Sequence, residues 1–95
     1  MIKAIKIWAR NRNLHTAKPR DQFLKVVEEV GELGGSLARN NEEAIKDAIW
    51  DIVVTLVVLS ETLGYDYDEC VRLAYDEIKD RKGKLVDGIF IKEVE

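Results

Sequence analysis

Apolar residues recur every three or four positions in four stretches of the chain, and this spacing predicts four helices. The second stretch begins at Pro19, which lacks the N–H that a first helical turn leaves unpaired. The third begins after Asn41, a good N-cap, and ends at Gly64, which accepts the left-handed closing conformation. Short connections between successive helices predict two helical hairpins. The predicted helices cover residues 2–10, 19–39, 42–63 and 67–82.

The C-terminal segment shows a different pattern. Residues 84–92 place β-forming side chains on both sides of Asp87-Gly88, the commonest type of two-residue hairpin turn. We therefore expect a small β-hairpin. Two strands alone are marginally stable, so this hairpin must dock on something else.

The third predicted helix is apolar around nearly its whole circumference, and a helix of that kind must be buried on all sides. Three other short helices can hardly enclose it, so we expect a second copy of the chain to cover the remaining side. The sequence thus predicts an all-α fold, a four-helix bundle completed by homo-oligomerisation as a homodimer or homotetramer. The C-terminal hairpin is appended to this single domain, residues 1–95.

Composition narrows the choice of function. A chain of 95 residues is one domain, and its net charge of −3, with the 15 Lys and Arg spread along it, argues against nucleic acid as a partner. A single cysteine, Cys70, leaves no intramolecular disulfide and no Cys-rich zinc site, and it is expected in the core. The longest apolar run, residues 48–59, is interrupted by Asp51 and is shorter than the roughly 20 residues that cross a bilayer. We expect a cytoplasmic protein that does not bind membranes.

Acidic residues cluster on the second and third predicted helices. Glu28, Glu29 and Glu32 are helical neighbours that repel one another. Asp51 lies inside an apolar run, where a carboxylate is costly to bury unless it is paired or bound to a cation, and Asp47 lies one turn earlier. If the two helices pack antiparallel, these acids meet. The alternatives are a solvated acidic face, or a salt bridge from Asp51 to a buried Lys or Arg.

Clustered carboxylates without His or Cys are hard oxygen ligands, which suit Mg²⁺ or Mn²⁺ and argue against zinc. Mg²⁺ in proteins commonly works with substrate phosphates. The acid cluster therefore predicts a phosphoanhydride substrate.

These residues also carry a family resemblance. Residues 28–32 have the form EExxE, and Asp47 to Asp51 stand where the MazG-like, all-α nucleoside triphosphate pyrophosphohydrolases carry ExxD. The chain resembles a short member of that group, of the kind found in phages and bacteria, from Gln22 to Phe90. The resemblance implies a four-helix bundle that is dimeric or further paired. It also implies Mg²⁺-dependent hydrolysis of an NTP or dNTP to the monophosphate and pyrophosphate. The all-carboxylate ligand set leaves Mn²⁺ as a possible substitute.

The resemblance assigns roles by position. Glu29, Glu32 and Asp51 match the metal ligands, and Glu28 matches the motif glutamate that binds metal or orients the attacking water, which makes it the catalytic candidate. Ala48 stands at the ExxD glutamate position, so Asp47 is the candidate to replace that glutamate, and the number of metal ions is left open. The candidate substrate-binding residues are Gln22, Lys25, Asp76, Arg81, Lys82 and Lys84.

Two features keep other interpretations open. Lys and Arg near a helix C-terminus are equally explained by the helix dipole. The alanine at position 48 is also compatible with an inactive helical dimerisation or partner-binding module, or with a metal-binding regulator. No Ser, Cys or His is placed to form a covalent intermediate, so direct attack by water is the expected course. The family resemblance implies that this attack falls on the α-phosphorus.

Overall fold

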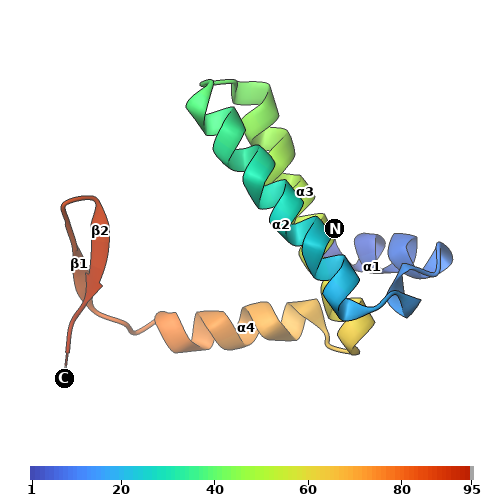
Figure 1. Cartoon of the computed structure of the whole chain (residues 1–95). Helices are drawn as coiled ribbons and strands as arrows, with labels where there is room; N and C mark the ends of the chain where they lie inside the picture. The colour runs from blue at the N-terminus through green and yellow to red at the C-terminus, as the bar shows by residue number, and fades with distance from the viewer. Residues whose placement is uncertain (95) are drawn as a thin grey trace.

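The computed structural model describes residues 1–94, and a pair of long antiparallel helices forms its body (Figure 1). α2 (Pro19–Ala38) and α3 (Glu42–Leu63) pack along their lengths, as the sequence predicts. The Asn41 side chain caps α3 by accepting a hydrogen bond from the Ala44 N–H at 3.1 Å. Gly64 ends the helix with a φ of 74°, a left-handed conformation that suits glycine.

The N-terminal segment packs against α3. It consists of α1 (Ile2–Asn11) and a 3₁₀ turn, η1 (Leu14–Thr16), both of which contact α3. Ala9 of α1 is fully buried there. The Arg10 guanidinium lies 2.6 Å from the carboxylate of Glu61, whose side chain is only 6% exposed. A small residue and an ion pair therefore hold α1 on α3.

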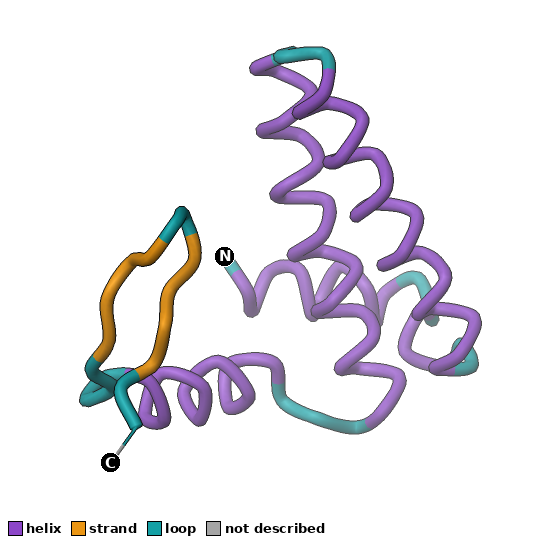
Figure 2. Tube along the Cα trace, turned by 60° about the vertical axis from the view of Figure 1, so that its left-hand side comes forward, coloured by secondary structure: helices purple, strands orange, loops and turns teal. Residues whose placement is uncertain are grey.

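The fourth helix leaves this body at a sharp angle. α4 (Tyr67–Ile78) is inclined by 108° to α3, and the chain then forms the antiparallel hairpin of β1 (Gly83–Val86) and β2 (Ile89–Lys92) (Figures 1 and 2). Asp87 and Gly88 both have positive φ, which is typical of the predicted two-residue turn. Apart from Tyr67, every residue of α4 and of the hairpin is exposed.

The mostly helical fold and the C-terminal hairpin are confirmed, with two corrections to the predicted elements. The fourth helix ends at Ile78 rather than at 82, because residues 79–82 are all charged and offer no apolar side chain to hold another turn. The second helical hairpin is wrong. The left-handed Gly64 and the extended Asp66 redirect the chain, so α4 meets α3 only near the corner.

This bend changes the burial that the sequence predicts. Within one chain α4 does not complete a four-helix bundle, so Ile49 and Trp50 of α3 remain 52% and 56% exposed. Cys70, expected in the core, is exposed on α4. Over residues 1–94, no helix taken singly has both the length and the apolar character needed to cross a membrane; α3 and α4 satisfy that test only as a bent pair.

Candidate functional site

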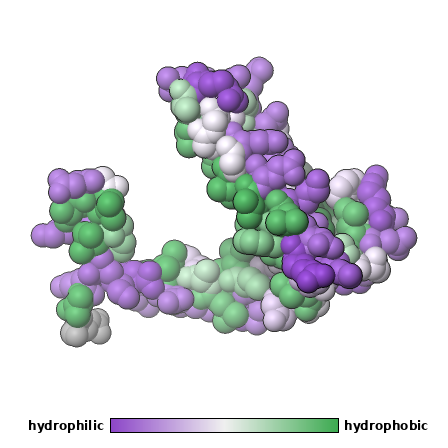
Figure 3. Space-filling view, viewed as in Figure 1, coloured by the Kyte–Doolittle hydropathy of each residue, from purple (hydrophilic) through white to green (hydrophobic). Residues whose placement is uncertain are grey.

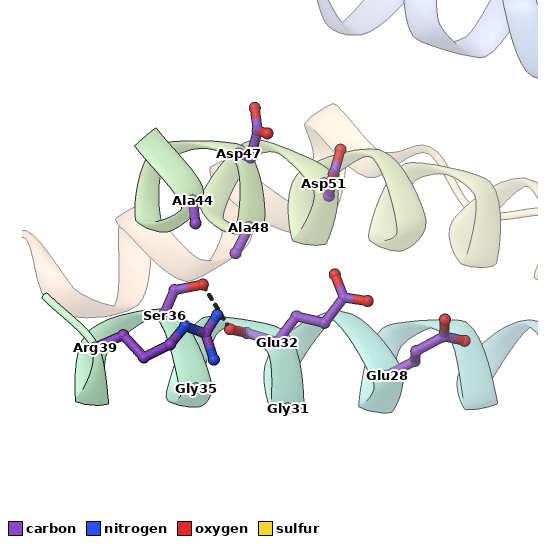
Figure 4. Close-up of a pocket in the computed structure, with 10 residues that line it drawn as sticks. All are labelled: Glu28, Gly31, Glu32, Gly35, Ser36, Arg39, Ala44, Asp47, Ala48 and Asp51. Atoms are coloured by element: carbon purple, nitrogen blue, oxygen red, sulfur yellow. Dashed lines mark hydrogen bonds between the residues drawn. The ribbon is translucent and has the colours of Figure 1, made fainter. Parts of the chain in front are cut away.

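A pocket of about 500 Å³ opens between the C-terminal half of α2 and the N-terminal half of α3 (Figure 4). Glycine and alanine on the facing sides of the two helices leave the space for it. Around them stand four carboxylates, one hydroxyl and one guanidinium. The lining residues are Glu28, Gly31, Glu32, Gly35, Ser36, Arg39, Ala44, Asp47, Ala48 and Asp51.

Helical spacing positions the four carboxylates. Glu28 and Glu32 are one turn apart on α2, and Asp47 and Asp51 are one turn apart on α3. In Figure 4 the Glu32 side chain reaches from α2 toward α3, whereas Asp47 and Asp51 project side by side from α3. The structure therefore gathers four of the five predicted acids around one pocket.

These side chains do not form a complete set of ligands around one metal ion. Within residues 1–94, no three His, Cys, Asp or Glu side chains converge closely enough to hold one metal ion as they stand. The donor set itself is all carboxylate, which fits Mg²⁺ or Mn²⁺. All four carboxylates border this open pocket.

Glu29, the fifth predicted acid, lies beside the pocket rather than in its lining. It is half-buried, and its Oε2 atom is buried without a hydrogen-bond partner among the described residues. Burial, followed by the negative charges of Glu32 and Asp51, raises the pKa of Glu29. This carboxylate therefore lies in a region where a proton or a cation is favoured.

Arg39 is a pocket residue that the sequence analysis missed. It is the C-cap residue of α2, and its side chain lies over Gly35, where an added Cβ would come within 3.1 Å of the Arg39 Nη1 atom. Although four carboxylates line the same pocket, Arg39 forms no ion pair with any described residue. The available signal was the spacing of Gly35 and Arg39, one helical turn apart. Ser36, also missed, is buried and donates a hydrogen bond to the Glu32 carbonyl oxygen at 2.8 Å.

Two of the six candidate substrate residues lie on α2. The Gln22 side-chain amide donates a hydrogen bond to the Thr55 carbonyl oxygen at 3.2 Å, which links α2 to α3. Lys25 is exposed and its Nζ lies 3.6 Å from the Glu28 carboxylate. Lys25 is therefore beside the acidic pocket, whereas Gln22 serves the packing of the helix pair.

The other four lie away from the pocket: Asp76 on α4, Arg81 and Lys82 in the segment after α4, and Lys84 on β1 (Figures 1 and 2). Asp76 pairs with Arg72 at 3.0 Å, and Arg81 pairs with Glu77 at 3.3 Å. Lys82 and Lys84 border a separate pocket of about 490 Å³ beside β2. The bend after α3 therefore keeps these residues from the acidic pocket within one chain.

Comparison with known proteins finds one phage relative. Over 62 residues the chain is 44% identical to an uncharacterized 18.2 kDa protein of the rep-hol intergenic region of Haemophilus phage HP1. The match covers 64% of this chain and 38% of that protein. No protein-family model matches the chain. No solved structure matches it either.

Proposed function

We propose that this chain is a Mg²⁺-dependent nucleotide pyrophosphohydrolase, which converts an NTP or dNTP and water to the monophosphate and pyrophosphate. The observation that supports this most is that four carboxylates line one open pocket between α2 and α3. The raised pKa of the neighbouring Glu29 adds to it, because burial and then repulsion from the nearby acids disfavour its negative charge, and a bound cation would offset both. The resemblance of residues 28–32 and 47–51 to the MazG-like motifs supplies the reaction.

Each acid has a proposed role. Glu29, Glu32 and Asp51 hold the metal, and Asp47 takes the place of the missing motif glutamate. Mg²⁺ supplies Lewis-acid stabilisation of the charge on the phosphoryl oxygens. Glu28, which is more than half exposed, orients a water molecule and accepts its proton. The water oxygen bonds to the α-phosphorus as the bond to the pyrophosphate oxygen breaks.

Recognition of the nucleotide and its phosphates is proposed to involve two copies of the chain. Lys25 contributes from the same copy, because it already lies beside Glu28. Arg81, Lys82 and Lys84, together with Asp76, are held away from the pocket by the bend. We therefore assign them to the pocket of a partner copy in a homodimer or homotetramer. Arg offers a planar fork to a phosphate and Lys a compact charge.

A panel of standard and modified NTPs and dNTPs, incubated with the protein and Mg²⁺, tests this proposal by the release of pyrophosphate. We expect activity on at least one member, with Mn²⁺ as a substitute. Glu32→Gln should abolish it. Glu43→Gln is a matched control, because Glu43 is an exposed acid in the first turn of α3 outside the pocket. Absence of pyrophosphate across the panel would favour the inactive helical module.

A further inference from the structure

The bent shape of the chain leaves an unusual amount of surface uncovered. The accessible area is 7467 Å², whereas a compact monomer of this mass exposes about 5,600 Å². The radius of gyration is 16.0 Å, against about 12 Å for a compact chain of this length. The excess area is well above the roughly 800 Å² that each partner contributes to a standard protein interface. One chain therefore has enough spare surface for a stable dimer.

One part of this uncovered surface is an apolar side of α4. Cys70, Val71, Ala74 and Ile78 follow one another at helical spacing, and all four are exposed. Figure 3 shows apolar residues along α4 and on the hairpin. A helix of 12 residues is marginal in water without packing, so this side needs a cover.

On the opposite side of α4 the charged side chains already pair with one another. Arg72 pairs with Glu69 at 2.9 Å and with Asp76 at 3.0 Å. These pairs satisfy the polar side in water. What remains without a partner is the apolar side, so the missing cover is an apolar surface rather than a charged one.

A surface of that kind lies on the body of the same chain. Met1, Ala4, Ile5 and Trp8 of the N-terminal segment, with Val54 of α3, line an apolar groove of about 290 Å³. Trp8 is 42% exposed there, although the Arg12 guanidinium covers its ring at 4.6 Å. The bend of 108° carries α4 away from α3, so the groove and the apolar side of α4 do not cover each other within one chain.

We propose that the apolar side of α4 from one copy packs in the α1–α3 groove of a second copy, and that the exchange is reciprocal. A second copy is the fitting occupant because it offers both surfaces at once, and a two-fold arrangement buries two helices and two grooves together. The docking itself does not depend on the proposed reaction. Where that reaction holds, the exchange of α4 also brings Arg81, Lys82 and Lys84, which follow α4 in the chain, toward the partner.

The only cysteine of the chain is a native reporter of this contact. Cys70 is exposed in one chain, but it is covered when α4 docks. We expect a dimer by sedimentation velocity at micromolar concentration, with slow reaction of Cys70 with a maleimide. Val71→Glu should raise the dimer dissociation constant at least about tenfold, because it places an unpaired charge in the contact, and should speed the labelling in parallel.

Leu73→Glu is the matched control. Leu73 is 55% exposed and Val71 is 50% exposed in one chain, but helical spacing places Leu73 about 160° around the helix from Val71, between Glu69 and Glu77. We expect the Leu73 variant to remain a dimer with slow labelling. Circular dichroism checks that both variants keep the helix content of the wild type.

Mixing two variants tests the contact even when one variant folds poorly alone. Val71→Glu mixed with the groove variant Ala4→Glu should form mixed dimers, because one α4 and one groove in each pair remain intact. A monomeric wild type with native helix content would overturn the proposal. So would a dimer in which Cys70 reacts freely, or in which the Val71 and Leu73 variants dissociate equally. None of these readouts uses nucleotide turnover, so they stand apart from the test of the reaction.

Discussion

Glu29 is an acidic residue whose negative charge the fold leaves without a stabilising partner among the described residues. One of its carboxylate oxygens is buried without a partner among the described residues, and its neighbours Glu32, Asp51 and Glu28 are all negative. Burial is the largest cause of its raised pKa, and the nearby charges add to it. The folded chain therefore favours either a proton on Glu29 or a cation close to it.

This environment predicts a specific pH dependence for Glu29→Gln. Because the folded state binds the Glu29 proton more tightly than the unfolded state does, the wild type loses stability as pH rises from the ordinary glutamate pKa through the raised one. The glutamine variant lacks this loss. Its free energy of unfolding should therefore exceed that of the wild type increasingly toward neutral pH, as measured by urea denaturation in a pH series.

Added Mg²⁺ tests the same electrostatic account in a second way. Millimolar Mg²⁺ should raise the melting temperature of the wild type by mass action, and Asp51→Asn should remove the increment. Glu43→Gln is again the control. Two results together would contradict the electrostatic account. One is a free energy of unfolding that changes with pH in the same way in the wild type and in Glu29→Gln. The other is a melting temperature that does not change when Mg²⁺ is added.

The sequence predicts this acid cluster better than it predicts the other pocket residues. The 3.6-residue period and antiparallel packing suffice to bring Glu28 and Glu32 toward Asp47 and Asp51. Arg39 could not be found in that way. Its place over Gly35 depends on a missing side chain and on how α2 ends, and neither follows from a pattern of charges.

At the scale of elements, ion pairs link the shorter helices to each other and to the body of the chain. Lys6 of α1 donates to the carboxylates of Asp66 and Asp68 at the start of α4, and these contacts raise the pKa of Lys6 and lower that of Asp66. Local periodicity predicts each helix because it needs only neighbouring residues. The direction of α4 depends on Gly64 and on contacts more than fifty residues apart, as between Lys6 and Asp66, so the helix spacing alone could not predict it.

The Arg10–Glu61 pair should make a larger contribution to stability than surface pairs. Arg10→Met leaves the nearly buried Glu61 carboxylate without its cation, so we expect the free energy of unfolding to fall by about 1–3 kcal/mol. Urea denaturation measures the change. Lys46→Met removes the exposed pair with Glu42 and serves as the control, with little expected change. Equal losses in the two variants would show that burial of Glu61 does not matter.

At the scale of the whole molecule, the proposed site is divided between two ends of the chain. The acids lie between α2 and α3, and the basic residues lie beyond α4 (Figure 1). The sequence predicts both sets, because each belongs to a short motif. It does not predict their separation, because the angle between α3 and α4 is a property of the folded chain.

Subunit complementation tests whether the two sets act in different copies. Glu32→Gln and the double variant Lys82→Ala/Lys84→Ala should each lose most activity alone. After refolding together, half of randomly paired dimers are mixed and each holds one intact site, so about a quarter of the wild-type activity should return. No recovery, with mixed dimers present, would place acids and bases of the site in the same copy.

The position of the bond that breaks tests the central claim most directly. With the nucleotide that the protein turns over, hydrolysis in ¹⁸O-labelled water with Mg²⁺ should put the label in the monophosphate and leave the pyrophosphate unlabelled, because water attacks the α-phosphorus. Glu28→Gln should lose this turnover while it still binds the nucleotide. Release of inorganic phosphate with a diphosphate product, label in the pyrophosphate, or an unimpaired Glu28→Gln would contradict the account.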